Sequence, residues 1–191
     1  MALEALPEAE LARRCRRGDP RAWRELVRRF TPLVYRLALR MVRDGGEAED
    51  VSQEVFLRMH RSFDSYDPTR PLAPWVARTA YHACLRRLES SARRPSPTAD
   101  PEALSALPDE GARSPEQAAA AGESVALLER ALGDLSVQDR ALLDLRYREG
   151  LSDAEVSEAT GMAVNTVKTR IFRARARLRA WLAPYLARGG A

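Results

Sequence analysis

Apolar residues recur about every three to four positions along most of this chain, which is the spacing of amphipathic helices. The first such stretch runs from Pro7 to Arg17 and ends at Gly18-Asp19-Pro20. A longer one runs from Arg21 to Val42, where Pro32 removes a backbone donor and predicts a bend. Few segments show the alternation of apolar and polar residues that is typical of a β-strand. The pattern therefore predicts an all-α protein.

Further helices are expected after a turn at Asp44-Gly45-Gly46. One spans Glu47 to Arg61, and another is opened by Pro71 or Pro74 and runs to about Ser90. The apolar side of the long Arg21–Val42 helix consists of Trp23, Leu26, Val27, Phe30, Val34, Leu37, Ala38 and Met41. The apolar residues around Leu26 to Leu39 fit either a partner surface or core packing.

The composition changes between Ser90 and about Gly122, where prolines are frequent and large apolar side chains are scarce. Such a segment buries too little surface to offset the entropy of ordering its backbone. From Pro95 to Val125 its acids are Asp100, Glu102, Asp109, Glu110, Glu116 and Glu123, against the single base Arg113. These features predict a flexible acidic linker. Helical periodicity resumes at Glu123, so two small helical domains are expected.

The stretch from Leu151 to Arg179 has the pattern of a helix, a tight turn and a second helix. Ser152 and Glu155 have the spacing of a capping box. Gly161 stands where a left-handed residue would end the first helix. The second helix is expected to begin near Val164.

The second helix has one apolar stripe and many cations. The stripe is expected to consist of Val164, Val167, Ile171, Ala174, Leu178 and Trp181 or Leu182. The cations expected on its outer surface are Lys168, Arg170, Arg173, Arg175, Arg177 and Arg179. A cationic helix entered through a glycine turn has the geometry for insertion into a DNA major groove. A solvated basic helix that closes a bundle is the alternative.

The segment from Ala48 to Phe63 is the second informative stretch. Val51, Val55 and Met59 lie four residues apart and are expected to face a core, which leaves the polar residues outside. An ordinary surface helix with an i,i+4 pair such as Glu54–Arg58 explains the periodicity equally well. The following loop and helix interleave aromatic rings with cations, a combination that suits single-stranded nucleic acid. Core packing of Phe63, Tyr66 and Trp75 is the alternative.

Composition limits the remaining function classes. The formal net charge is +4 and the pI is about 9.5, so the basic bias is modest and concentrated in particular helices. Cys15, Cys84, His60 and His82 are too few for a disulfide framework or a zinc cluster. No apolar run approaches the ~20 residues that span a bilayer, and no signal peptide is evident. We therefore expect a cytosolic, non-catalytic protein without metal, cofactor, membrane insertion or small-molecule substrate.

Two stretches, taken together and in this order, resemble a known family. Phe30–Ala80 is similar to region two, and Leu132–Leu178 to region four, of the bacterial RNA polymerase sigma factors of the sigma-70 family, in their extracytoplasmic-function (ECF) group. The resemblance implies residues 1–90 as a domain that binds core polymerase and the −10 element. It implies 91–122 as the linker and 123–188 as a helix-turn-helix domain that reads the −35 element.

The resemblance also implies roles for individual residues. Those expected to dock on the β′ clamp helices of core polymerase are Asp50, Gln53, Glu54 and Phe56. Those expected at the −10 element are Arg61, Ser62, Phe63, Asp64, Tyr66, Trp75, Arg78, His82 and Arg86. Those expected at the −35 element are Asn165, Thr166, Lys168, Thr169, Phe172 and Arg173. Arg175 and Arg177 are expected to contact phosphate or nothing. An anti-sigma factor is an implied partner.

The sequence departs from the family on the helix after Trp75. His82 stands where the family often has Asn, and Arg86 where it often has Asp, so the usual −10 preference is in question. Two other functions remain open at this point. A helix-turn-helix regulator would bind duplex DNA without polymerase, and a helical adaptor would bind polymerase without reading DNA.

Overall fold

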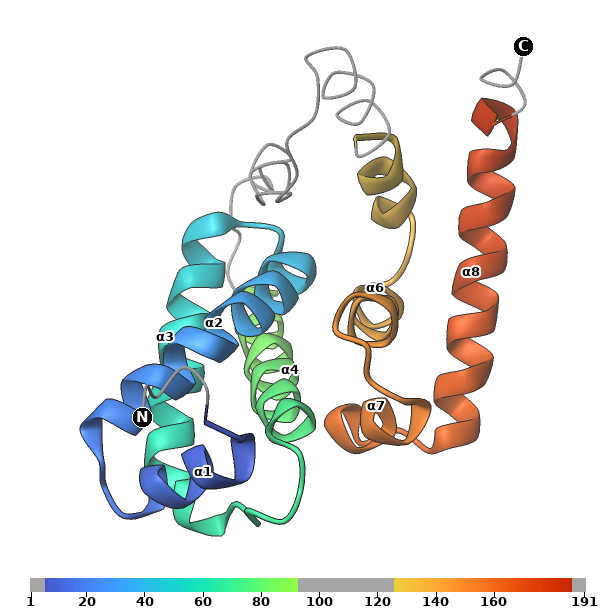
Figure 1. The fold of residues 1–191 in the computed structure, drawn as a ribbon. Helices are drawn as coiled ribbons and strands as arrows, with labels where there is room; N and C mark the ends of the chain where they lie inside the picture. Colours follow the sequence, from blue (N-terminus) through green and yellow to red (C-terminus); the bar gives the residue numbers. More distant parts are fainter. Residues whose placement is uncertain (1–5, 93–125, 187–191) are drawn as a thin grey trace, which may run out of the picture.

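The computed structural model describes residues 6–92 and 126–186, and every regular element in these ranges is a helix. The N-terminal domain contains α1 (Glu8–Arg16), α2 (Pro20–Val42), α3 (Gly45–Ser62), the short 3-10 helix η2 (Phe63–Ser65) and α4 (Leu72–Ser91). Figure 1 shows these helices gathered into one bundle. The prediction of an all-α fold is confirmed for the described residues.

Local capping explains where α2 and α3 begin. The Asp19 carboxylate accepts a hydrogen bond of 2.8 Å from the Arg21 backbone N–H, and the Asp44 carboxylate accepts one of 2.8 Å from the Glu47 N–H. Because Asp44 caps α3, the two glycines that follow it lie inside the first turn of that helix. The predicted turn at Asp44-Gly45-Gly46 is therefore wrong, and the chain reverses at Arg43, whose φ is 60°.

Helix α2 supplies the centre of the N-terminal core. Leu26 and Leu39 are buried along with the apolar residues between them that face α3 and α4. Core packing, rather than an exposed partner surface, thus explains this segment. Val27 is half-buried, whereas Leu33, absent from the predicted apolar side, is buried.

The C-terminal domain begins with a helix at residues 126–133 and continues with α6 (Val137–Leu143), the π-helical turn η4 (Asp144–Arg148), α7 (Asp153–Thr160) and α8 (Val164–Leu186). The predicted capping box is confirmed, since the Ser152 side chain accepts from the Glu155 N–H while the Glu155 carboxylate accepts from the Ser152 N–H. Gly161 ends α7 with a φ of 75°, also as predicted.

The apolar stripe of α8 is confirmed only in its middle. Val167, Ile171 and Ala174 are buried and Leu178 packs partly against the core. Val164 is 37% exposed, so its assignment to the buried stripe is wrong. It is the first residue of the helix, and burial on α8 begins one turn later, at Val167.

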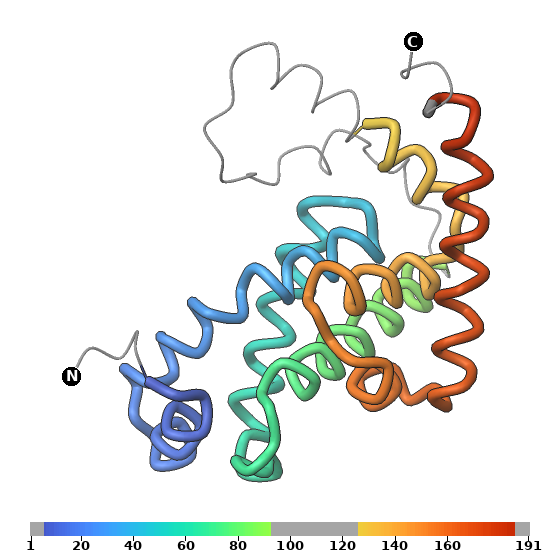
Figure 2. Tube along the Cα trace, turned by 45° about the vertical axis from the view of Figure 1, so that its right-hand side comes forward, coloured from blue at the N-terminus to red at the C-terminus, as the bar shows by residue number. Residues whose placement is uncertain are grey.

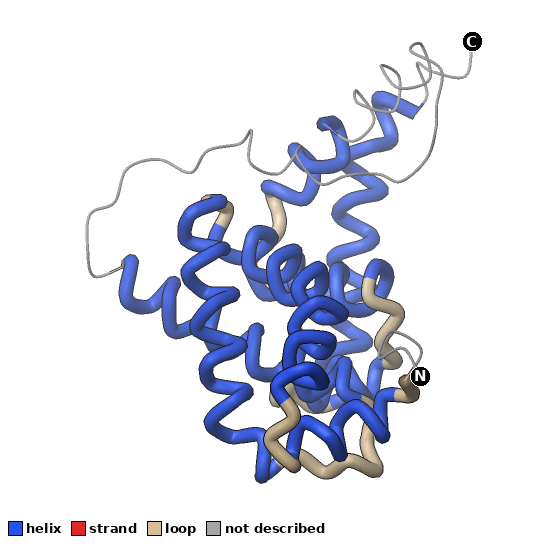
Figure 3. Tube along the Cα trace, turned by 60° about the vertical axis from the view of Figure 1, so that its left-hand side comes forward, coloured by secondary structure: helices blue, strands red, loops and turns tan. Residues whose placement is uncertain are grey.

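The two domains pack directly against each other. Helix α4 lies against α7, and α2 lies against α6; Figure 2 shows the C-terminal helices beside α4 and the far end of α8 projecting beyond the bundle. Figure 3 shows helices joined by short loops throughout the described parts. From residue 93 onward, the predicted linker (residues 91–122) lies outside the described residues. Among the described helices, none combines the length and the apolarity that crossing a bilayer requires.

Candidate nucleic-acid interface

The outer face of α8 presents every residue expected at a −35 element. Burial of Val167 and Ile171 turns the opposite side of the helix outward. The exposed residues of this side are Asn165, Thr166, Lys168, Thr169, Phe172 and Arg173. Phe172 is 73% exposed, which leaves its ring free to contact a partner. The face therefore combines neutral hydrogen-bonding side chains, two cations and an apolar ring, the groups that read base edges.

Arg170 does not belong to this outer surface. Its Nε atom donates to Asp139 Oδ1 at 2.7 Å and a terminal nitrogen donates to Gln138 Oε1 at 2.6 Å. Burial raises the pKa of Asp139, but hydrogen bonds from Arg170 and Ser136 outweigh it and hold that pKa below its ordinary value. The prediction that Arg170 is an outer cation is wrong, because it anchors α8 to the start of α6.

Arg175 also turns away from the reading face. Its guanidinium lies 5.5 Å from the centre of the Tyr147 ring, in a cation–π contact with the π-helical turn η4. Tyr147 itself is 56% exposed. Arg177 is exposed on the same helix as Arg173. Arg173 is thus the exposed arginine among the residues predicted to read bases.

Helix α3 carries the acidic and amide face expected to meet core polymerase. The Asp50 side chain is 67% exposed, and Gln53 is exposed beside it. The predicted pair between Glu54 and Arg58 is confirmed, since Arg58 Nε donates to Glu54 Oε1 at 2.7 Å. Phe56 is half-buried and packs against the core. A nitrogen of Arg87 on α4 lies 3.6 Å from Asp50 Oδ2.

Leu57 is a candidate that sequence reasoning did not assign to this face. It is 59% exposed, one helical turn after Gln53 and Glu54. An apolar side chain surrounded by polar groups is typical of the centre of a protein–protein interface. The sequence carries only a weak signal that Leu57 is exposed, because Leu57 fits the spacing of the core-facing apolar residues almost as well as its neighbour Phe56.

The aromatic residues after α3 form a cluster rather than an open stacking platform. Phe63 is 4% exposed and Tyr66 is 3% exposed, whereas Trp75 is half-buried. The Trp75 ring centre lies 5.5 Å from that of Phe63 and 5.1 Å from that of Tyr66. Burial raises the pKa of Tyr66 to about 12, and its hydroxyl donates to the Arg70 carbonyl. In this arrangement Phe63 and Tyr66 support the loop, and bases have no access to their faces.

The remaining residues expected at the −10 element are mostly exposed. Arg61, Ser62, Asp64, Arg78 and Arg86 are exposed on α3, η2 and α4. His82 is half-buried on α4, and burial, followed by the charges of Arg78 and Arg86, lowers its pKa. The surface therefore carries cations that suit a phosphate backbone. It also carries the His82 imidazole, which is neutral at pH 7.

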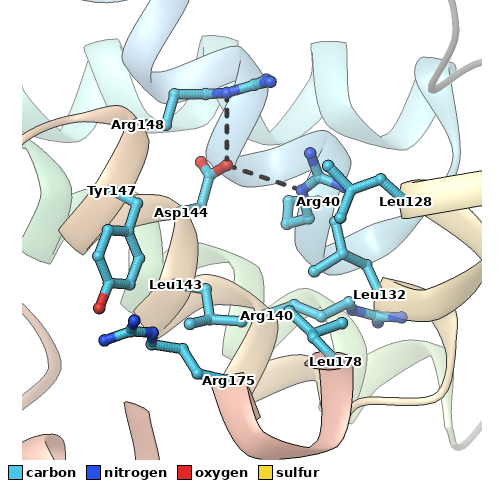
Figure 4. Close-up of a pocket in the computed structure, with 10 residues that line it drawn as sticks. All are labelled: Arg40, Leu128, Leu132, Arg140, Leu143, Asp144, Tyr147, Arg148, Arg175 and Leu178. Carbon is cyan, nitrogen blue, oxygen red and sulfur yellow. Dashed lines mark ion pairs between the residues drawn. The ribbon is translucent and has the colours of Figure 1, made fainter. Parts of the chain in front are cut away.

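A separate hollow of about 660 Å³ lies where the C-terminal domain meets α2 (Figure 4). Its lining residues are Arg40, Leu128, Leu132, Arg140, Leu143, Asp144, Tyr147, Arg148, Arg175 and Leu178. Burial raises the pKa of Asp144, although Arg40 Nε lies 3.7 Å from its carboxylate. Burial also lowers the pKa of Arg140 to about 10. The hollow therefore combines leucine side chains with charged groups, of which Arg40, Arg140 and Asp144 are buried.

The surroundings of the two cysteines disfavour the thiolate form. Cys84 is buried and Cys15 is half-buried. Burial raises the pKa of Cys84 to about 12 and that of Cys15 to about 11. The thiolate is the nucleophilic and metal-binding form. Both thiols thus remain protonated near neutral pH.

Comparison with known proteins identifies both domains. The family model described as Sigma-70 region 2 matches residues 26–94, and the model described as Sigma-70, region 4 matches residues 126–178. The chain is 33% identical over 185 residues to the RNA polymerase sigma-H factor of Pseudomonas aeruginosa, with 94% of this chain and 95% of the relative covered. It is 32% identical over 178 residues to the ECF RNA polymerase sigma-E factor of Escherichia coli, with 90% and 92% covered.

Solved structures agree with this result. A structure of CnrH in complex with the cytosolic domain of CnrY is 25% identical, covers 93% of this chain and 97% of that chain, and has a TM-score of 0.67. The sigma factor RpoE in complex with the anti-sigma factor NepR from Bartonella quintana, at 21% identity, shares the fold with a TM-score of 0.62 over 80% and 91% of the two chains. The chain described here belongs to the sigma-70 family of RNA polymerase sigma factors, in its ECF group.

Proposed function

We propose that this chain is a non-catalytic specificity subunit that binds core RNA polymerase and directs it to promoters by opening the −10 element and reading the −35 element. The observation that carries the proposal is the presence, in one chain, of an outward cationic reading helix and an outward acidic helix face. The first suits duplex DNA, and the second suits a basic protein partner. Polymerase and promoter meet in the cytoplasm, so we place the chain there.

Helix α3 is the proposed docking surface for the β′ clamp helices. Asp50, Gln53 and Glu54 supply complementary charge and hydrogen bonding, while Leu57 supplies an apolar centre. Phe56 is half-buried and packs against the core, so its proposed part is to hold the orientation of this face. Arg87 must share Asp50 with the partner, because it lies 3.6 Å away.

The loop after α3 and the outer side of α4 are the proposed −10 surface. Arg61, Arg78 and Arg86 would follow the phosphates of the opened strand, and Ser62 and Asp64 would contact an extruded base. Extrusion costs a few kcal/mol of stacking, which a fitted pocket must offset. Trp75 is the ring best placed to stack on a base, since Phe63 and Tyr66 are buried whereas Trp75 is only half-buried. His82 would contribute hydrogen bonding rather than charge.

Helix α8 is the proposed −35 reader. Arg173 and Lys168 would donate to guanine O6 and N7, which is the commonest specific contact in the major groove. Asn165, Thr166 and Thr169 would meet bases or phosphates near the start of the helix. Phe172 would contact the methyl group of a thymine.

The solved structures with the same fold lead to a second class of partner, an anti-sigma factor. Because a fold neighbour is bound to an anti-sigma factor, we propose that this chain too is held inactive by such a protein. Its apolar contact would be the hollow between α2 and the C-terminal domain, where Leu128 and Tyr147 are exposed.

Transcription in vitro with purified core polymerase on a pooled promoter library tests the proposal. We expect initiation at templates that share two spaced elements, and no initiation with core polymerase alone. Absence of initiation at any template, with a folded protein, would refute the function. Specific duplex binding without polymerase would instead favour the helix-turn-helix regulator.

Variants separate the proposed surfaces. Asp50→Arg combined with Glu54→Arg should abolish co-purification with core polymerase, whereas Glu89→Arg, at the exposed end of α4, should not. Arg173→Ala should cost about 1–3 kcal/mol of promoter discrimination. Arg175→Ala, on the side of α8 that faces Tyr147, is the matched control and should leave discrimination unchanged. An equal loss on random DNA would reassign Arg173 to phosphate contact.

A further inference from the structure

The hollow between α2 and the C-terminal domain is built around a π-helical turn. The backbone N–H of Glu149 donates to the Asp144 carbonyl at 3.1 Å, a bond across five residues that belongs to the turn η4. Asp144, Tyr147 and Arg148 of this turn all line the hollow, whose volume is about 660 Å³. Single π-helical turns are frequent at functional sites, and small-molecule sites have volumes of about 300–1,000 Å³. The hollow therefore has the size and the local backbone of a binding site.

Two buried polar atoms in the lining have no hydrogen-bond partner among the described residues. They are Nε of Arg140, a residue that is 5% exposed, and Oδ2 of Asp144, a residue that is 7% exposed. A buried donor or acceptor without a partner costs free energy, and each such group in a native protein requires an explanation. A ligand in the hollow that accepts a hydrogen bond from Arg140 would provide one.

Arginines outnumber acids around the hollow (Figure 4). The cations are Arg40, Arg140, Arg148 and Arg175, and the one acid among the described lining residues is Asp144. Burial raises the pKa of Asp144, so this carboxyl group opposes an incoming anion less than an exposed aspartate would. The electrostatic balance therefore favours an anionic ligand.

Arg140 is the arginine with the most to gain from an anion. Arg40 already donates to the Glu129 carboxylate at 2.7 Å. Burial, followed by the charges of Arg43 and Arg40, lowers the pKa of Arg140 to about 10. A buried cation beside like charges is stabilised when an anion pairs with it. Arg148, whose side chain is 46% exposed, can add a second contact from a more open position.

The apolar part of the lining is mainly aliphatic. The four leucines that contribute to it are Leu128, Leu132, Leu143 and Leu178. Leu128 is 41% exposed, so part of this apolar surface meets solvent. Placing an alkyl chain against the leucines removes apolar surface from water on both sides. A ligand that combines an alkyl chain with an anionic group would therefore match both parts of the lining.

We propose that this hollow is a binding site for a small amphipathic anion, a carboxylate or phosphate monoester carried on an alkyl chain. The anionic group accepts hydrogen bonds from Arg140 Nε and from Arg148, and the alkyl chain lies against the leucines. This role goes beyond the proposed function and does not depend on it. Because an anti-sigma factor is proposed to contact the same hollow, the anion would compete with that protein.

Isothermal titration calorimetry of the full chain with decanoate, below its micelle concentration, tests the site. Decanol supplies the alkyl chain without the charge, and inorganic phosphate supplies the charge without the chain. Arg140→Met removes the buried cation and its Nε donor but keeps a long side chain, and Arg148→Gln removes the more exposed cation. Arg24→Gln, at an exposed position of α2 outside the lining, is the matched control.

We expect decanoate to bind at a single site, about tenfold or more tightly than decanol or phosphate. Arg140→Met should weaken decanoate binding about tenfold and Arg148→Gln about threefold, whereas Arg24→Gln should change it by less than about twofold. Equal affinities for decanoate and decanol, or equal affinities of the Arg148→Gln and Arg24→Gln variants, would overturn the proposal. If Arg140→Met does not fold, the NMR signal of Arg140 Nε–H in the wild type decides. It should shift on addition of decanoate and stay in place with decanol, and an unchanged signal with both would refute the contact.

Vesicles of phosphatidylglycerol distinguish a free anion from a lipid in a bilayer. We expect the chain to remain in the supernatant, because Arg140 is buried and an anionic headgroup in a bilayer would reach only Arg148. Sedimentation of the wild type, but not of Arg148→Gln, with the vesicles would overturn the assignment to a free ligand. Failure of the proposed function would leave the titrations unchanged, since they contain neither polymerase nor DNA.

Discussion

His82 has cations four residues away on either side, at Arg78 and Arg86, and is half-buried on α4. Burial and then these two charges lower its pKa below the ordinary 6.5. The imidazole is therefore neutral at pH 7. Where the family often has Asn, this chain has a ring that donates and accepts hydrogen bonds without adding positive charge.

The lowered pKa of His82 predicts a pH dependence of stability. The unfolded chain takes up a proton near pH 6.5, whereas the folded chain takes it up only at lower pH. Acidification through this range therefore favours unfolding. We expect His82→Asn to remove this part of the loss while changing stability little at neutral pH. Urea unfolding of both proteins at about pH 7.5 and about pH 5.5 measures the difference. Parallel losses would show that His82 does not contribute.

Individual residues also show why burial was predicted only in part. The helical period placed Val167 and Ile171 correctly, because a helix on one side of a core must bury one stripe. The period could not distinguish Arg170 from Arg173, since both lie beside that stripe. What separates them is Asp139 on another helix, a contact between residues far apart in the chain. Phe63 and Tyr66 were ambiguous for the same reason.

At the scale of single elements, helix ends were the most predictable features. The capping box of α7 and the left-handed Gly161 depend on hydrogen bonds and backbone angles within a few residues. The error at Gly45 and Gly46 has a local cause as well. Glycine is unfavourable inside a helix, so two adjacent glycines predict a turn. Here the Asp44 carboxylate caps a helix whose first two residues are Gly45 and Gly46.

Gly161 provides a test of the turn that presents α8. Its φ of 75° is strained for any residue with a Cβ. We expect Gly161→Ala to destabilise the C-terminal domain by about 1–2 kcal/mol. Gly46→Ala is the matched control, because Gly46 lies inside α3 without a positive φ and should lose nothing. Thermal unfolding followed by circular dichroism measures both. Equal stability of the two variants would contradict the strain argument.

Arg170 provides a test of how α8 is held. Its guanidinium bonds to Asp139 and Gln138 at the start of α6. Arg170→Met should remove these charge-assisted bonds and cost about 1–2 kcal/mol of stability. Arg177→Met, an exposed position on the same helix, should change stability by less than about 0.5 kcal/mol. Chemical denaturation of both variants measures the difference. A similar cost for the two would show that Arg170 is not an anchor.

At the scale of the whole molecule, the sequence predicted two domains but not their contact. Arg70 and Glu158 are 88 positions apart in the sequence, and each fits an ordinary solvated surface when read alone. Periodicity reports which face of a helix is buried, but not against which distant helix it lies. The candidate DNA surfaces could be predicted from local patterns, whereas the packing of α7 against α4 depends on the three-dimensional structure.

The ion pairs between the two domains predict that their separation responds to charge reversal. Arg36 donates to Glu149 Oε1 at 2.7 Å, and Arg70 donates to Glu158 Oε2 at 2.6 Å. Glu149→Arg combined with Glu158→Arg places like charges opposite both arginines, so we expect a larger radius of gyration than in the wild type, which small-angle X-ray scattering measures. Adding Arg36→Glu and Arg70→Glu restores both pairs and the wild-type net charge, and should return the radius of gyration to the wild-type value. Exposed ion pairs contribute only about 0–1 kcal/mol each, so equal radii for all three proteins would mean that apolar packing, rather than these pairs, holds the domains together.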